Sequence, residues 1–143
     1  MSAKVNSFLA FVLALGPGSV VYGQGLKGEY FANMTLSGAP AYTRIEAVDF
    51  NWGANSPGDP LGANAFSVRW TGSITPLVSG DYTFTLASDD GSRLWVGGDL
   101  IVNFWSDHAL GTRSSAPVSL EAGQAYGIKV EFYENGGDAV VQL

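Results

Sequence analysis

The chain contains no cysteine and only one histidine, His108. Without thiols, neither disulfide bonds nor thiolate chemistry is available to it. A single imidazole leaves zinc sites and Ser-His-Asp nucleophile arrangements with little to build on. Asp107 and His108 are therefore predicted to belong to a structural turn. Stability must come from the core and from any metal that the chain binds.

Basic residues are also scarce. Seven Lys and Arg residues stand against thirteen Asp and Glu residues, which gives a formal net charge of −6. An acidic surface repels phosphate groups. We therefore expect neither nucleic acid nor an anionic membrane to be a partner.

Long apolar runs are missing as well, apart from residues 8–15 near the N-terminus. This run follows Lys4 and precedes a breaker-rich stretch at 16–18, and small residues near 21–23 suit a signal peptidase. It is far shorter than the roughly 20 residues that span a bilayer. We predict that residues 1–23 are a secretory signal peptide, with a membrane anchor as the alternative. Cleavage would leave a secreted or cell-surface domain with a charge of −7, because Lys4 is lost.

Residues 24–143 contain many short runs of β-branched and aromatic residues, broken by Gly, Pro, Asn and Asp, and no convincing amphipathic helix. This spacing predicts one all-β domain, an antiparallel β-sandwich. The expected strands include 81–88, a hairpin formed by 92–96 and 100–104, and 124–133. A closing strand at 139–143 is expected to pair with 124–133.

Alternation of side chains predicts which faces of these strands are buried. In 124–133, Lys129 and Glu131 are expected to point outward. The residues expected to point inward from 81–88 and 124–133 are Tyr82, Phe84, Leu86, Tyr126, Ile128, Val130 and Phe132.

Two adjacent carboxylates, Asp89 and Asp90, lie in a turn between two of these strands. If both face inward at about 4 Å, they repel by about 1 kcal/mol in water and by more near a protein surface. A cation would relieve this repulsion, and Ca²⁺ accepts carboxylate, amide and backbone oxygens in a flexible geometry. The alternative is a solvated hairpin turn, for which Asp and Gly are favoured.

A second oxygen-rich segment, residues 134–138, joins the last two expected strands. Asn135 and Asp138 can supply side-chain oxygens to an ion, and Gly136 lets a backbone carbonyl approach it closely. Glu134 is expected to face solvent. Arg93 is expected to point outward from its strand, with pairing to the acidic turn as an alternative.

The four tryptophans are divided between the core and the surface. Core packing is expected for at least two of Trp70, Trp95 and Trp105, because aromatic residues dominate small β cores. Trp52 lies in a polar stretch between residues 49 and 65 that is dense in turn formers. It is expected to be exposed and is our aromatic candidate for ligand contact.

Several segments together resemble the PA14 domain family: GLKGEYF at 25–31, GDYTF at 80–84, SDDGSRLWV at 88–96, LIVNFW at 100–105, LEAGQAY at 120–126 and YENGGDA at 133–139. The family pattern runs a residue or two beyond Leu143, so either the final strand is trimmed or the chain is a piece of a larger protein. The resemblance implies a β-sandwich that often serves glycosidases and adhesins as an accessory carbohydrate-binding module.

In lectin-like members of this family the paired Asp residues are joined by a cis peptide and chelate a Ca²⁺ that sugar hydroxyls also contact. The resemblance therefore implies Asp89 and Asp90 as metal and ligand contacts, Asn135 as the stronger further ligand and Asp138 as the weaker one.

We expect a secreted, non-catalytic, calcium-dependent carbohydrate-binding module. The alternative is a structural or protein-interaction PA14 module of a larger surface or secreted protein. A glycosidase needs carboxylates about 5–9.5 Å apart across a cleft. Adjacent aspartates are a poor match, so no catalytic residue is expected.

Overall fold

A computed structural model describes residues 11–13, 20–22 and 25–143. The predicted all-β fold is confirmed, since these residues form strands, turns and loops without a helix. Most of the predicted signal peptide lies outside the described residues. The strands are β1 (Phe11–Leu13), β2 (Val20–Tyr22), β3 (Leu26–Phe31), β4 (Tyr42–Glu46), β5 (Asp49–Gly53), β6 (Phe66–Pro76), β7 (Gly80–Tyr82), β8 (Thr85–Asp89), β9 (Ser92–Val96), β10 (Asp99–Phe104), β11 (Gly111–Ser114), β12 (Val118–Leu120), β13 (Tyr126–Glu134) and β14 (Ala139–Gln142).

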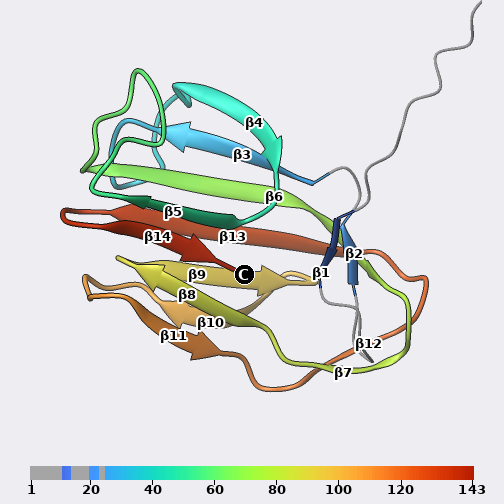
Figure 1. Ribbon diagram of the computed structural model, residues 1–143. Coiled ribbons are helices and arrows are strands. Elements are labelled where there is room, and N and C mark those ends of the chain that lie inside the picture. The colour runs from blue at the N-terminus through green and yellow to red at the C-terminus, as the bar shows by residue number, and fades with distance from the viewer. Residues whose placement is uncertain (1–10, 14–19, 23–24) are drawn as a thin grey trace, which may run out of the picture.

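The strands form two main antiparallel sheets that lie against each other (Figure 1). The larger has the order β1-β2-β6-β13-β9-β10, and β3 also pairs with β6 and carries β4 on its outer side. The smaller has the order β11-β8-β14-β5, and a separate pair joins β7 to β12. Within the described ranges, no helix has the length and apolar character needed to cross a membrane.

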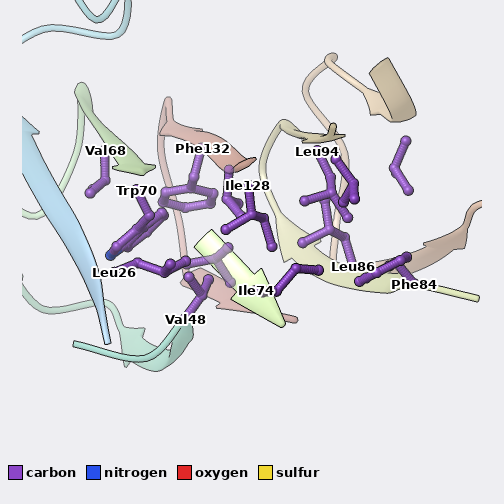
Figure 2. Close-up of a cluster of buried hydrophobic side chains, with 14 of the residues drawn as sticks. Leu26, Val48, Val68, Trp70, Ile74, Phe84, Leu86, Leu94, Ile128 and Phe132 are labelled. Carbon is purple, nitrogen blue, oxygen red and sulfur yellow. The ribbon is translucent and has the colours of Figure 1, made fainter. Parts of the chain in front are cut away.

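The core fills the space between the two sheets (Figure 2). Trp70 of β6, Val130 of β13 and Leu94 of β9 are in register across the larger sheet, and all three are fully buried. Leu86 and Val141 meet this layer from the smaller sheet. Because successive strand residues face opposite sides, one set of alternate positions forms this core and the other forms the outer face.

The predicted inward faces are largely confirmed, but the strand at 81–88 is divided. Tyr82, Phe84 and Leu86 are buried, as expected. The chain nevertheless leaves strand geometry between β7 and β8, because β7 pairs with β12 and β8 pairs with β11 and β14. The alternation predicted the buried face, whereas the change of partner strand decided where the strand breaks.

The expected pairing of the last strand with β13 is wrong. β14 pairs with β5 and β8 in the smaller sheet. The reason is that β6 and β9 already occupy both edges of β13, so no edge remains for β14. The segment between β13 and β14 therefore crosses from one sheet to the other.

The tryptophan expectation also needs correction. Of Trp70, Trp95 and Trp105, only Trp70 belongs to the buried core, where it is 0% exposed. Trp95 is opposite Lys129 of β13 on the outer face of the larger sheet, and Trp105 follows β10. Both are half-buried.

Glu131 points outward from β13, as predicted, but it is only 3% exposed. The Nε of Arg69 donates to its Oε1 at 3.0 Å, and the Nε of Arg93 donates to its Oε2 at 2.8 Å. The Arg93 guanidinium also lies 3.8 Å from the centre of the Trp105 ring. Arg93 is therefore engaged with Glu131 and is neither fully solvated nor paired with the acidic turn.

Candidate functional site

Three carboxylates converge at one end of the sandwich. Asp89 ends β8, Asp90 follows it, and Glu134 ends β13. One oxygen from each lies within 4.8 Å of the others. Figure 1 shows the turns that join β8 to β9 and β13 to β14 at this same end, together with the loop between β10 and β11. The peptide bond between Asp89 and Asp90 is cis, as the family resemblance implies.

Packing of the acidic turn against β13 brings these groups together. The backbone N–H of Tyr133 donates to the carbonyl of Gly91 at 2.9 Å. A Cβ added at Gly91 would lie 2.1 Å from the Tyr133 ring, so this position requires glycine. The turn is thereby held directly beside Glu134, the next residue of β13.

Asp90 is the structural centre of the site. It is 5% exposed. Its Oδ1 accepts the backbone N–H of His108 at 3.1 Å, and its Oδ2 accepts the backbone N–H of Asn135 at 2.9 Å. Each carboxylate oxygen has two lone pairs, so both oxygens can accept a further contact. Asp90 thus joins the acidic turn to two other loops and still has capacity for an ion.

Glu134 is the least satisfied group of the site. It is 0% exposed, and neither of its carboxylate oxygens has a hydrogen-bond partner in the described part of the chain. Burial, and then the charges of Asp90 and Asp89, raise the pKa of Glu134 to about 8, while the Asp90 backbone opposes this rise. A buried, unpaired carboxylate is costly when ionised, which is why its pKa is raised.

The expectation that Glu134 faces solvent is wrong, and the sequence contained a signal against it. Ile128, Val130 and Phe132 point inward, so residue 134 has the same parity and faces inward too. The predicted strand ends at residue 133, whereas β13 continues through Glu134.

The pKa of Asp89 is also raised by its surroundings. Burial and then the Asp90 charge raise its pKa, and the charge of Asp138 adds to this, while the Leu110 backbone and His108 oppose it. Asp138 itself is exposed and does not belong to the group of three converging carboxylates in the described residues. Its charge nevertheless reaches both Asp89 and Glu134.

Asn135 and Gly136 follow Glu134 at the rim. The backbone of Asn135 holds Asp90, and its Nδ2 donates to Oδ2 of Asp107 at 2.7 Å. Gly136 is exposed, and a Cβ added there would have nothing within 4 Å. Packing therefore does not explain the glycine at this position.

Trp52 does not lie in an exposed loop, so that expectation is wrong. It belongs to β5 and is half-buried. Its ring stacks on Phe50 at 4.7 Å with an interplanar angle of 8°, and it meets the ring of Phe66 edge-on at 5.7 Å. Part of the predicted loop therefore forms a strand, because its aromatic residues pack against the core.

His108 has the structural role that was expected. Its ring stacks on Phe104 with the centroids 3.5 Å apart, and its Nδ1 lies 2.9 Å from the carbonyl oxygen of Ala109. Its backbone N–H is one of the two that hold Asp90. The loop between β10 and β11 is therefore part of the wall of the site.

The donor set fits a hard divalent cation. All three converging groups are carboxylates, and among the residues that the structure describes none gives the buried oxygens of Glu134 a hydrogen bond. Negative charges held this close repel one another unless a proton or a cation intervenes. An all-oxygen set suits Ca²⁺ or Mg²⁺, and the irregular loop geometry suits the more flexible Ca²⁺ shell.

Comparison with known proteins defines the class to which this sandwich and its acidic end belong. A profile of the PA14 domain matches residues 23–143, so the chain belongs to the PA14 domain family. The resemblance noted in the sequence is thereby confirmed.

Two similar proteins are described as anti-sigma factors. The chain is 43% identical over 122 residues to the anti-sigma-I factor RsgI3 of Acetivibrio thermocellus, covering 85% of this chain and 19% of that protein. It is 41% identical to the solved structure of an anti-sigma factor domain-containing protein from Clostridium clariflavum, with a TM-score of 0.77, covering 82% of this chain and 40% of that one. The chain thus spans well under half the length of either relative.

A more distant solved structure is a PA14 sugar-binding domain from an RTX adhesin. It has a TM-score of 0.67 at 21% identity and covers 82% of this chain and 86% of its own. At this level of identity the similarity shows the shared fold.

Proposed function

We propose that this domain is a secreted or cell-surface, non-catalytic carbohydrate-binding module that depends on Ca²⁺. The observation on which this depends is the buried Glu134 carboxylate, which has no partner among the described residues and lies beside Asp89 and Asp90. These three residues would hold the ion. Further ligands would come from the segment that follows Glu134. They are a side-chain oxygen of Asn135, the Gly136 carbonyl and Asp138.

The protein residues prepare the site before any ligand arrives. Asp90 is fixed by two backbone amides, so its oxygens have little freedom to turn away. A bound calcium ion would neutralise the three acids and offer open coordination positions to sugar hydroxyls. Because such a site is shallow and polar, affinity per site should be modest, and attachment to a larger protein would raise avidity.

Leu110 replaces Trp52 as our candidate for apolar contact with the sugar. It is 59% exposed, and its backbone is close enough to Asp89 to lower the pKa of that carboxyl. The packed ring of Trp52 has much less free surface. An exposed apolar side chain on a segment next to Asp89 suits the C–H face of a pyranose ring.

The adhesin domain that shares this fold is called sugar-binding, and this supports sugar as the ligand class of the proposal. The alternative is a structural or protein-interaction module. It is favoured by the 43% identical relative, whose name describes an anti-sigma factor. In either case we propose that the module belongs to a larger polypeptide.

Calcium-dependent glycan binding tests this proposal. We would measure thermal unfolding with calcium and with EDTA, and probe a glycan array under both conditions. Asp89→Ala should remove the calcium response and the array signal while the sandwich stays folded, and Asp99→Ala, at an exposed position on β10, is the matched control. A calcium shift without any glycan signal would favour the alternative, and an Asp89→Ala variant with an unchanged calcium response would contradict the metal assignment.

Two further measurements test the metal ligands and the absence of catalysis. Protons compete with the ion for carboxylates, so calcium binding should weaken as the pH falls. Reducing-sugar release should be absent, and sustained turnover by the isolated module would contradict a non-catalytic role.

A further inference from the structure

Asp107 lies outside the group of three converging carboxylates, in the loop between β10 and β11. Both of its oxygens nevertheless accept short hydrogen bonds from the segment that leads into the site. The Tyr133 hydroxyl donates to Oδ1 at 2.6 Å, and the Nδ2 of Asn135 donates to Oδ2 at 2.7 Å. The two donors lie on either side of Glu134 in the sequence, so Asp107 holds both neighbours of the buried acid.

We infer that Asp107 is a positioning residue for the metal site, which fixes Tyr133 and Asn135 so that residues 133–135 present their oxygens to the ion. This inference rests on the proposed function. With Nδ2 of Asn135 bound to Asp107, Oδ1 is the side-chain atom of Asn135 that stays available as a ligand. Metal sites commonly depend on such outer partners, which orient the ligands without touching the ion.

The loop that contains Asp107 is itself fixed. Beside it, the backbone N–H of His108 donates to Asp90, and the His108 ring stacks on Phe104. On its other side, Trp105 packs against the Tyr133 ring at 4.7 Å with an interplanar angle of 69°. Asp107 therefore joins the loop between β10 and β11 to the two residues on either side of Glu134.

Exposure separates a positioning role from a purely structural one. Asp107 is exposed, and its hydrogen bonds hold its pKa below the usual range. Removing this carboxylate leaves the Asn135 amide to water, whereas the Tyr133 hydroxyl belongs to a side chain that is only 7% exposed, so we expect a loss of stability limited to about one hydrogen bond. Metal binding should change more, because loss of an outer partner typically weakens it by roughly tenfold to a hundredfold.

The test compares Asp107→Ala with the unaltered chain by calcium titration calorimetry and by thermal unfolding in EDTA. We expect calcium binding at least about tenfold weaker, faster hydrogen exchange at the Asn135 amide without metal, and only a small loss of stability in EDTA. Asp107→Asn should rescue part of the loss, because its amide oxygen can still accept from Tyr133. Asp99→Ala should bind calcium normally.

Three outcomes would overturn the inference. If Asp107→Ala binds calcium like the unaltered chain, the positioning role fails and the proposed function stands. If Asp107→Ala lowers the free energy of unfolding in EDTA by as much as it lowers the free energy of calcium binding, Asp107 is a structural residue only. If the unaltered chain binds no calcium, the proposed function fails and the inference falls with it.

Discussion

Two glutamates on the same strand, Glu131 and Glu134, are both buried and have opposite surroundings. Glu131 is 3% exposed and receives hydrogen bonds from two arginines on the outer face of the larger sheet. Glu134 is 0% exposed, has no partner among the described groups and faces two further acids. One strand therefore contains a neutralised carboxylate and, three residues later, an uncompensated one.

The two carboxylates differ in whether the fold supplies a counter-charge. The fold supplies the counter-charge of Glu131 itself, so that residue needs nothing from solution. Glu134 needs a proton or a cation, and it lies beside Asp89 and Asp90 at the end of β13. Variants at Glu131 and Glu134 test whether these two environments differ in this way.

The largest effect on folding should come from Glu131→Ala. Removing this carboxylate leaves two guanidinium groups without their partner, although both are about 30% exposed and can turn to water. We expect a loss of roughly 2 kcal/mol in the free energy of unfolding, below the usual cost of breaking a fully buried pair. Urea unfolding would measure it, with Glu29→Ala, in an exposed Lys27 pair, as the control. A loss as small as that of the control would contradict the structural role.

Glu134→Gln should reverse this pattern. Without metal, native Glu134 keeps a proton below its pKa of about 8, and the neutral amide removes the free-energy cost of that protonation, so stability should be unchanged or higher. Calcium binding should weaken by roughly tenfold or more, since a charged ligand is lost. Calorimetry on Glu134→Gln and Glu131→Gln compares the two positions directly. Equal calcium affinity in the two variants would show that the environments do not differ in function.

The metal-free protein should lose stability as the pH rises. Between the ordinary pKa of 4.5 and the folded pKa of about 8, native Glu134 keeps a proton that the unfolded chain has released. The native state therefore binds more protons, and the free energy of unfolding falls with increasing pH across this window. We expect a decrease on the order of 1–2 kcal/mol in EDTA, since neighbouring acids titrate together. Glu134→Gln should flatten the profile, and an unchanged slope in that variant would contradict the assignment.

The smallest effect should be that of Leu110→Ala on glycan binding. Losing part of an apolar contact should weaken binding by a few-fold, consistent with about 0.8 kcal/mol per buried methylene. Calcium affinity should stay the same, because Leu110 offers no side-chain ligand. Leu100→Ala, an exposed leucine on β10, is the matched control. A change in calcium affinity, or identical glycan binding by both variants, would count against Leu110 as a sugar contact.

Alternation in the sequence predicted much of the fold. It gave the strand at 92–96 and the buried faces of β8 and β13 correctly. It could not predict that β14 joins the smaller sheet, because that depends on both edges of β13 being occupied by strands distant in sequence. Trp52 was misplaced for a similar reason, since beyond Phe50 on its own strand its ring packs against Tyr30 of β3, Phe66 of β6 and Phe132 of β13.

The candidate site was predicted only in part. The acidic pair and Asn135 were identified from oxygen-rich turns, and the structure brings Asp90 and Asn135 into contact. Glu134 was missed although its parity on β13 indicated an inward position. Asp107 was assigned to a structural turn, and its two partners depend on tertiary contacts that no local pattern reveals.

The most direct test of the central claim is a high-resolution crystal structure of this domain grown with abundant calcium. We predict a density peak 2.3–2.6 Å from oxygens of Asp89, Asp90 and Glu134, the range of calcium–oxygen contacts. An empty space between these oxygens at saturating calcium would contradict the account.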